Sequence, residues 1–257
     1  MRELDPHLAS RVRFVLVGTQ HTGNIGSAAR AMKTMAFTEL VLVSPSRLPD
    51  ETALAMAAGA LDTLDNAVIV ESLAEAVKDC HLVIGTTARS RRIGLEEFTP
   101  LTAMQRVRTV LMDNADSRVA IVFGRERTGL TNDELQLCNA GVMIPANPEY
   151  SSLNLAAAVQ VLAYELRSQL TQDERVVALA TAWMPEVPAT HGQMEGFFAQ
   201  LSTILDAIDF HKGREAKSAL FKLRRTFLRT PMEEKELRML RGILHDMQRA
   251  LKIRNED

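Results

Sequence analysis

Short apolar runs alternate with helical patterns along residues 11–144, and this alternation limits the possible folds more than any other feature of the chain. Six runs predict strands, at 11–18, 40–43, 67–70, 81–85, 119–124 and 142–144. The spacing of apolar residues between them predicts helices over 24–35, 51–59, 72–79, 101–115 and 132–138. Near-continuous apolar strands separated by helices are typical of a mostly parallel sheet with both faces covered. The expected fold class is therefore α/β.

Glycine-rich polar loops follow three of these strands. They occupy residues 19–30, 86–92 and 124–131. The carboxyl ends of parallel strands meet at one edge of a sheet, where ligands bind. Several of the loop residues are Arg, whose planar fork suits phosphate, and helix N-termini supply N–H groups at the same edge. We expect an anion-binding edge there.

A fourth loop follows the last predicted strand at Pro145. The helix after it is expected to begin near Leu153, with Ser151 or Ser152 as its N-cap. Small residues at 156–158 would let a backbone or a cofactor approach closely. An ordinary capped turn before a buried helix explains the same residues, and both interpretations stay open.

The composition, 46% hydrophobic and 24% charged over 257 residues, is that of an ordinary soluble globular protein. No apolar run reaches the roughly 18 residues of a membrane span, and the N-terminus lacks the apolar core of a signal peptide, so we expect a cytoplasmic protein. Cys80 and Cys138 form no CxxC motif or Cys/His cluster. They are interpreted as buried structural thiols, without a disulfide or a metal site.

Charge is distributed unevenly along the chain. Residues 211–254 hold 13 Lys and Arg against 5 Asp and Glu, a balance of +8, which leaves −10 for the remainder. Residues 171–195 contain Pro185 and Pro188 and are expected to form a linker between a domain at 1–170 and a small basic helical module at 196–257. Two explanations are open for the basic module: an anionic partner, or a solvated helical face.

Common catalytic and nucleotide-binding motifs are absent from the sequence. It contains neither GxGxxG nor GxxxxGK[ST], and it has no clear Ser-His-Asp or Cys-His arrangement. His21 and His81 are as compatible with a structural role as with a catalytic one. A polar site with several Arg and without an acid/base pair favours group transfer from a reactive cofactor over hydrolysis.

Three segments together are more specific than any one of them. NIGSAARAMK at 24–33, VFGRERTGLT at 122–131 and IPANPEYSSLNLAAAV at 144–159 resemble, in this order, the three signature motifs of the SPOUT superfamily of RNA methyltransferases. The likeness is closest to the TrmJ-type tRNA (cytidine/uridine-2′-O-)-methyltransferases of bacteria. It runs from about residue 12 to 170 and extends more loosely into the basic module, which would then bind tRNA.

This resemblance implies a trefoil knot at about 123–155 and S-adenosyl-L-methionine as cofactor. The positions that match the family's cofactor-binding loops are Thr86, Thr87, Ala88, Gly124, Glu126, Gly129, Ile144, Ser151, Ser152 and Leu153. The resemblance also implies a homodimer in which each site is completed by the first-motif loop of the partner. The helix after Leu153 would supply an apolar interface stripe of Leu155, Val159, Leu162 and Leu166. Core packing is a second interpretation of the stripe, and the two are not exclusive.

The implied reaction is methylation of a ribose 2′-oxygen, at cytidine or uridine 32 of the tRNA anticodon loop. The matching catalytic positions are Arg30, Asn24, Ser152 and Asn154. Arg30 is either the proton acceptor or, since a guanidinium keeps its proton, the group that binds phosphate and the developing alkoxide. Glu126 is either a cofactor contact or an anchor of the glycine turn.

Some alternatives remain beside this interpretation. Arg89, Arg91 and Arg92 either contact RNA or lie in a solvated loop. A second hypothesis is that the chain is a non-catalytic RNA-binding scaffold. It stays open because a fold alone does not establish an activity. A nucleotide-binding regulator would need a phosphate-loop motif that the sequence lacks.

Overall fold

The computed structural model describes residues 3–88, 94–147, 149–150, 152–171, 187–210, 216–229 and 232–254. The chain divides into two compact units, Met1–Ala182 and Trp183–Asp257. The strands of the first unit are β1 (Val12–Val17), β2 (Glu39–Val43), β3 (Val68–Val70), β4 (Leu82–Thr86), β5 (Glu97–Phe98), β6 (Val119–Phe123) and β7 (Ala140–Val142). Its helices are α1 (Pro6–Ala9), α2 (Thr22–Thr34), α3 (Glu51–Ala57), η1 (Ala58–Ala60), α4 (Leu61–Asp65), α5 (Leu73–Val77), α6 (Pro100–Asp113), α7 (Asn132–Gln136) and α8 (Leu155–Leu170).

A seven-stranded sheet in the order β3-β2-β1-β6-β4-β7-β5 forms the centre of the first unit. Every strand pairing in it is parallel, which confirms the predicted α/β class. The sequence predicted six strands, one fewer than the sheet contains. The extra strand, β5, has two residues and pairs only at the edge, so it leaves almost no apolar pattern in the sequence.

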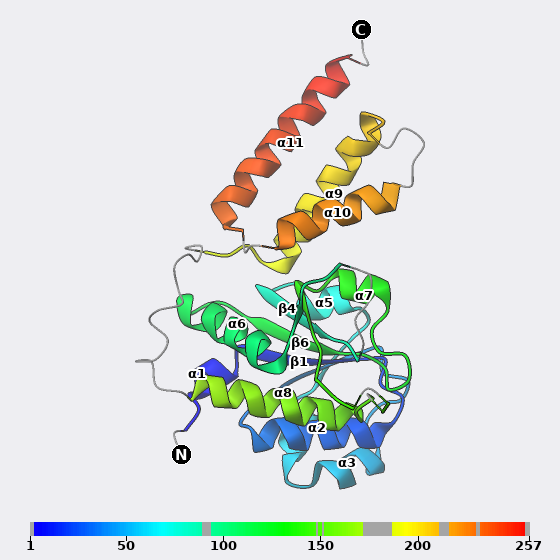
Figure 1. Cartoon of the computed structure of the whole chain (residues 1–257), viewed down its shortest axis with the longest axis vertical. Coiled ribbons are helices and arrows are strands. Elements are labelled where there is room, and N and C mark those ends of the chain that lie inside the picture. Colours follow the sequence, from blue (N-terminus) through cyan, green and yellow to red (C-terminus); the bar gives the residue numbers. More distant parts are fainter. Residues whose placement is uncertain are drawn as a thin grey trace. The chain divides into compact units, whose positions relative to one another are not determined.

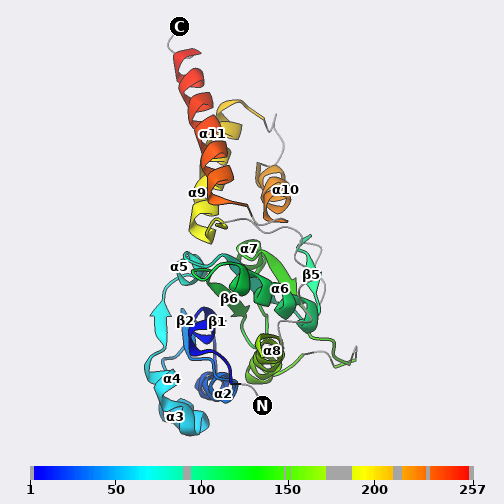
Figure 2. The same cartoon turned by 90° about the vertical axis from the view of Figure 1, so that its left-hand side faces the viewer.

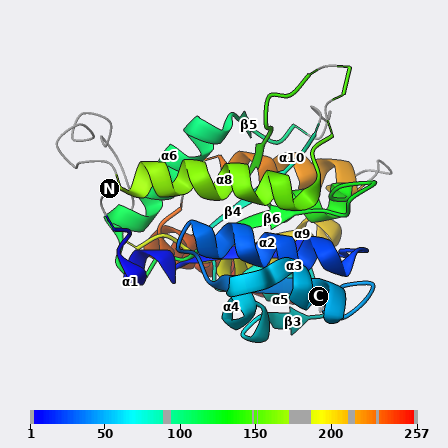
Figure 3. The same ribbon diagram turned by 90° about the horizontal axis from the view of Figure 1, so that it is seen from below.

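Helices cover both faces of the sheet (Figures 1 and 2). Alternate strand residues such as Val15, Val41 and Val122 form one buried cluster with α5 and α7. The opposite face carries α2, α8 and α6, and α3 packs outside α2; Figure 3 shows α8, α2 and α3 side by side. Because both faces are buried, the strands are apolar at nearly every position, which is why the sequence revealed them.

Two predicted elements end elsewhere than expected. The helix expected over 51–59 breaks after Ala57, because Ala58 adopts a left-handed φ of 47°, and the chain continues as η1 and α4. The strand expected over 142–144 is β7, which ends at Val142. Beyond it the chain runs extended toward Pro145, which lacks the N–H that a sheet ladder requires.

The N-cap of α8 is Asn154 and not Ser151 or Ser152 as the sequence indicated. The Asn154 side-chain oxygen accepts hydrogen bonds from the N–H groups of Ala156, at 2.9 Å, and Ala157, at 3.3 Å. Ser151 lies outside the described residues, and Ser152 lies in the extended segment before the cap. Asn154 is held in this place by a tertiary contact, described below, that local sequence does not encode.

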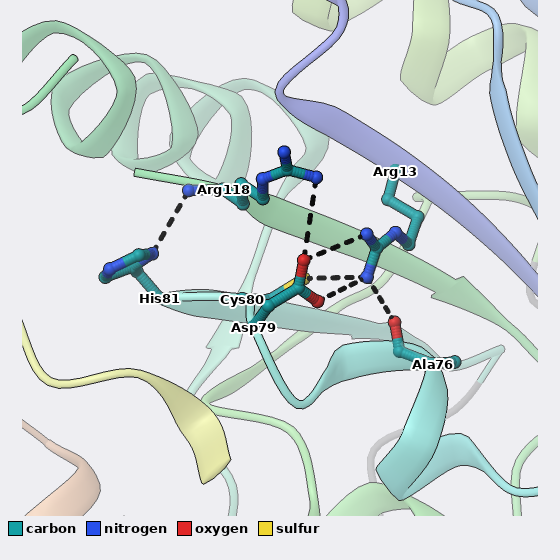
Figure 4. Close-up of polar contacts among 6 residues, drawn as sticks. All are labelled: Arg13, Ala76, Asp79, Cys80, His81 and Arg118. Atoms are coloured by element: carbon teal, nitrogen blue, oxygen red, sulfur yellow. Dashed lines mark hydrogen bonds and ion pairs between the residues drawn. The ribbon is translucent and has the colours of Figure 1, made fainter. Parts of the chain in front are cut away.

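A polar cluster ties three strands together at the amino-terminal edge of the sheet (Figure 4). Arg13 donates to both carboxylate oxygens of Asp79, at 2.7 and 3.1 Å, and to the carbonyl of Ala76 at 2.6 Å. Arg118 lies 3.6 Å from the same carboxylate, and its N–H donates to Nδ1 of His81. His81 is therefore part of a structural contact, at the edge opposite the glycine-rich loops.

The second unit contains α9 (His191–Ala207), α10 (Ala216–Leu228) and α11 (Glu234–Arg254), packed around a small apolar core. The linker expected at 171–195 is too long at its C-terminal end, because α9 already begins at His191. Thr190 and Gln193 form a capping box there and start the helix despite the glycines that follow. Residues 172–186 of the expected linker lie outside the described residues.

Both cysteines are free and buried, as expected. Burial raises the pKa of each thiol to about 12, so both stay protonated and unreactive. The described residues contain no group of three His, Cys, Asp or Glu side chains that could hold a metal ion. None of the helices in the described ranges is long and apolar enough to cross a membrane.

Candidate functional site

A cavity of about 320 Å³ lies at the carboxyl edge of the sheet, between the segments that follow β4, β6 and β7. Its lining includes nine of the ten residues that the sequence assigned to cofactor binding: Thr86, Thr87, Ala88, Gly124, Glu126, Gly129, Ile144, Ser152 and Leu153. The tenth, Ser151, lies outside the described residues. Three segments far apart in sequence meet here because the parallel strands before them end at the same edge.

The loop after β6 is folded back on itself and forms one wall of this cavity. Arg125 and Gly129 exchange two backbone hydrogen bonds, of 2.9 and 3.2 Å, and Gly129 has a left-handed φ of 67°. A Cβ atom on Gly124 would lie 2.1 Å from the backbone of Gly129 and Leu130. No side chain fits at position 124, so the glycine is required for the turn to close.

Glu126 points from this loop to the N-terminus of α2. Its carboxylate accepts hydrogen bonds from the backbone N–H groups of Gln20 and His21, at 3.0 and 3.1 Å, and from the side-chain amide of Asn24 at 3.0 Å. The helix N-cap, His21, makes no side-chain cap of its own, and Glu126 binds the two backbone N–H groups that lead into the helix. Burial alone would raise the pKa of Glu126, but these hydrogen bonds outweigh it and lower the pKa.

Asn24 connects Glu126 to the third motif. While its amide nitrogen donates to Glu126, its side-chain oxygen accepts from the amide of Asn154 at 2.9 Å. Asn154 in turn caps α8. We call this arrangement the Glu126–Asn24–Asn154 bridge; it links loops separated by 102 and 130 residues in sequence.

A second, more open hollow of about 580 Å³ lies beyond the bridge, and Asn24 and Asn154 line it. Five of its other lining residues, Gln20, His21, Thr22, Gly23 and Ser27, belong to the loop at 19–30 that the sequence placed at the ligand-binding edge. The sequence reasoning did not assign Arg47, Asp50, Thr52 and Met56 to the site. They follow β2, so the rule that ligands bind beyond the carboxyl ends of parallel strands could have identified them.

Arg30 does not join the other predicted catalytic residues. It is exposed on α2 and lines neither the cavity nor the open hollow. Ser152, by contrast, lines the cavity, and Asn24 and Asn154 are bonded to each other. A single chain therefore brings together three of the four predicted catalytic residues.

Of the Arg residues expected at this edge, one is paired within the chain. Arg125 makes two 3.0 Å contacts with the Glu134 carboxylate, which neutralises it. Arg127 is exposed and lines the cavity. Arg89, Arg91 and Arg92 lie outside the described residues.

The apolar stripe of α8 belongs to the core of its own chain. Leu155, Val159, Leu162 and Leu166 are at most 6% exposed, because α8 packs on α2 and α6. Of the two interpretations, core packing is correct, and the stripe is not available as an interface. Tyr164, 61% exposed, lies on the outer face of the same helix.

Comparison with known proteins identifies the family. Residues 11–164 match the SpoU rRNA Methylase family, and residues 192–256 match the TrmJ tRNA methyltransferase C-terminal domain. The tRNA (cytidine/uridine-2′-O-)-methyltransferase TrmJ of Yersinia enterocolitica is 46% identical over 239 residues, which cover 93% of this chain and 91% of that protein. The chain belongs to the TrmJ family of tRNA 2′-O-methyltransferases. The resemblance in the three sequence motifs is thereby confirmed.

Solved structures extend the TrmJ likeness to both units. TrmJ from Z. mobilis is 33% identical, with a TM-score of 0.78, and the match covers 92% of this chain and 98% of that one. A probable methylase family protein from Haemophilus influenzae is 41% identical, with a TM-score of 0.60 and coverage of 95% and 99%.

Proposed function

We propose that this chain transfers a methyl group from S-adenosylmethionine to the 2′-oxygen of cytidine or uridine 32 in tRNA. The residues around the cavity fit that cofactor. Thr86 and Thr87 line the cavity together with apolar side chains such as Leu130 and Ile144. Its volume of about 320 Å³ is within the range of small-molecule sites. Gly124 allows the loop after β6 to fold back as a wall of the cavity, because the backbone of Gly129 and Leu130 occupies the place of a side chain there.

The observation that carries the proposal is the Glu126–Asn24–Asn154 bridge. It ties the three motifs that distinguish the family into one unit at the mouth of the cavity, with Ser152 two residues before Asn154. A purely structural scaffold needs no such convergence of amides and hydroxyl beside a ligand cavity. These groups are hydrogen-bond partners suited to a ribose.

When bound, the cofactor supplies an activated methyl group. The residues of this chain must then orient the ribose and manage the proton of the 2′-hydroxyl. Ser152 and the two bridge asparagines, Asn24 and Asn154, are assigned to orientation. A guanidinium keeps its proton in proteins, so we assign Arg30 to the phosphate and the developing alkoxide and not to general-base catalysis.

The exposed position of Arg30 supports a homodimeric enzyme. Because Arg30 lines neither hollow of its own chain, it can act on a site only if another chain is adjacent. We propose that α2 of each protomer presents Arg30 to the site of the other. Exposed side chains on neighbouring helices, including Tyr164 and Leu54, are available for such a contact.

We also propose that residues 123–155 form a trefoil knot. Support comes from the order of the sheet, in which β7 pairs beyond β4 while the chain returns to place α8 against α2 and α6. We infer from this arrangement that the path between β6 and α8 crosses earlier parts of the chain. Knots are rare in proteins, so this assignment rests on the family and on that crossing.

The proposed domain roles follow from charge. The first domain, 1–170, would carry the methyltransferase site, the segment from there to Thr190 would connect it, and the basic helical module that begins with α9 would bind tRNA. A cytoplasmic location follows from the proposed substrate.

Transfer of labelled methyl from S-adenosylmethionine to unmodified bacterial tRNA, followed by nuclease mapping, tests the function. We expect one 2′-O-methyl group at nucleotide 32. Incorporation at another nucleotide would refute the proposed target. Cofactor binding without incorporation would refute tRNA as the substrate and point to another RNA. Absence of cofactor binding would favour the non-catalytic scaffold.

A further inference from the structure

A charged groove runs between α9 and α11 in the second unit. Two pairs of side chains bridge it: Gln193 donates to Glu234, and Gln200 donates to the carbonyl of Arg241 at 3.2 Å. Both pairs are 41 residues apart in sequence, so the two helices run parallel and in step over two turns. A hollow of about 370 Å³ lies between these bridges and also includes Arg238 and His245.

Arg241 is held in this groove with most of its guanidinium unused. Its Nε lies 3.4 Å from the side-chain oxygen of Gln200. The guanidinium lies over Gly196, where a Cβ atom would be 3.6 Å from its terminal nitrogen. In the part of the chain that the structure describes, no carboxylate pairs with Arg241. Two N–H edges are thus oriented by the protein and open to a ligand.

Other arginines of the module are differently placed. Arg224 pairs with Glu195, and its guanidinium lies 4.5 Å from the ring centre of Phe198, so it serves the core. Arg249 pairs with Asp246 at 3.2 Å on an exposed face. Unlike Arg224, Arg241 is exposed, and no described neighbour neutralises its charge.

Two further cationic or ionisable side chains extend the groove. Arg238, Arg241 and His245 follow one another at spacings of three and four residues, which puts them on one flank of α11. Leu237 and Leu244, both less than 9% exposed, fix the neighbouring face of the helix on α9. The three polar side chains therefore line the groove over about 10 Å of helix.

We infer that this groove is a binding site for the phosphate backbone of RNA, with Arg241 as its central contact. A guanidinium fork pairs with two oxygens of a phosphodiester, and Arg238 adds a second positive charge beside it. Glu234, the one acidic group among the described residues that line the hollow, already accepts a hydrogen bond from Gln193. This inference rests on the proposed function, since tRNA is the RNA concerned.

The test compares variants of the full-length chain in two assays: tRNA dissociation constants over a salt series, and methyl transfer at saturating tRNA. For the double variant Arg238→Gln/Arg241→Gln we expect at least about a tenfold weaker affinity and a salt slope reduced by roughly two, one for each lost phosphate contact. Transfer at saturating tRNA should be unchanged, because the groove does not hold reacting atoms.

Two further variants sharpen the result. Arg249→Gln removes the same charge from the same helix outside the groove, and its affinity should change less than threefold. Arg241→Lys keeps the charge but loses the fork, so it should weaken binding while keeping the wild-type salt slope. Thermal melting checks that each variant is folded. If the double variant is misfolded, the groove assignment is decided by comparing the tRNA affinities of Arg241→Lys and Arg249→Gln.

Failure of this inference differs from failure of the proposed function. If the wild type methylates tRNA and the groove variants bind it as tightly as Arg249→Gln does, the groove assignment is wrong and the function stands. If the wild type transfers no methyl group yet binds tRNA through the groove, the function is wrong and the groove stands.

Discussion

Two carboxylates in this protein have lowered pKa values for similar physical reasons but lie at opposite edges of the sheet. Glu126 accepts hydrogen bonds from the N-terminus of α2 beside the cavity. Asp79 is paired with Arg13 and Arg118 at the amino-terminal edge. For each, burial raises the pKa, and the partners outweigh that effect and lower it. Comparing variants of the two carboxylates therefore distinguishes a residue that supports the site, Glu126, from one that contributes only to stability, Asp79.

Replacing Glu126 by Gln should lower both stability and activity. The loss of a charged acceptor for three N–H groups is expected to cost about 1 kcal/mol after allowance for solvent screening. Because the folded pKa lies below the ordinary value of 4.5, the stabilisation is complete above that value and is lost as the pH falls through the folded pKa. Urea unfolding at pH 7 and at acidic pH should therefore show a gap between wild type and variant that closes in acid.

Asp79→Asn is the matched control. This variant should also be less stable than the wild type at neutral pH. The difference in stability should disappear as the pH falls below the ordinary pKa of 3.8 and through the lower folded pKa of Asp79. Methyl transfer should stay at the wild-type rate, because the Asp79 cluster lies at the far edge of the sheet (Figure 4). Equal loss of transfer in both variants would contradict the role given to the bridge.

The variant Arg30→Ala tests the one predicted catalytic residue that does not line the cavity or the open hollow of its own chain. We expect transfer to fall by about a hundredfold or more, as for removal of a group that stabilises developing charge. Cofactor affinity, measured by calorimetry, should remain within a few fold of the wild type. A large loss of cofactor binding would argue that Arg30 contributes to the cofactor site instead.

At the scale of elements, the start of α8 combines two functions in Asn154. The side-chain oxygen caps the helix, and the side-chain nitrogen donates to Asn24. Helix α2 similarly begins under the carboxylate of Glu126. The side chains at the starts of the two helices, Glu126 and Asn154, are thus joined through Asn24.

Substitutions at Asn154 separate these functions. Asn154→Asp keeps a good cap but loses the donor to Asn24, so the melting temperature should stay near that of the wild type while transfer falls by about tenfold. Asn154→Ala should lose about 1 kcal/mol of stability as well. Full activity in the Asp variant would show that the bridge does not position the site.

At the scale of the whole molecule, the two units carry different charge and different tasks. The sheet-containing unit holds the cavity, and the basic unit holds the α9–α11 groove. Each unit has its own apolar core. The first should therefore fold without the second.

A chain ending at residue 170 tests this division. We expect it to fold and to bind S-adenosylmethionine with the affinity of the full chain. Its tRNA affinity should be at least about tenfold weaker, since most phosphate contacts are lost. Unchanged tRNA affinity in a filter-binding assay would contradict the role of the basic module.

By itself, the sequence determined the parallel sheet and the location of the site. Strands buried on both faces are apolar throughout, and the glycine and polar residues after β4 and β6 are local signals for loops at one edge. The cavity-lining residues from Thr86 to Leu153 were found in this way together with the family motifs.

The tertiary structure alone decided what depends on contacts between distant segments. Asn154 and not Ser152 caps α8 because Asn24, 130 residues away, holds its amide. Glu126 is hydrogen-bonded to the start of α2, Arg125 is paired with Glu134, and the apolar stripe of α8 is buried in the core. Arg30 is exposed and lies away from the cavity. Periodicity reports which face of an element is apolar, but the partner of a polar side chain is set by how the elements pack in space.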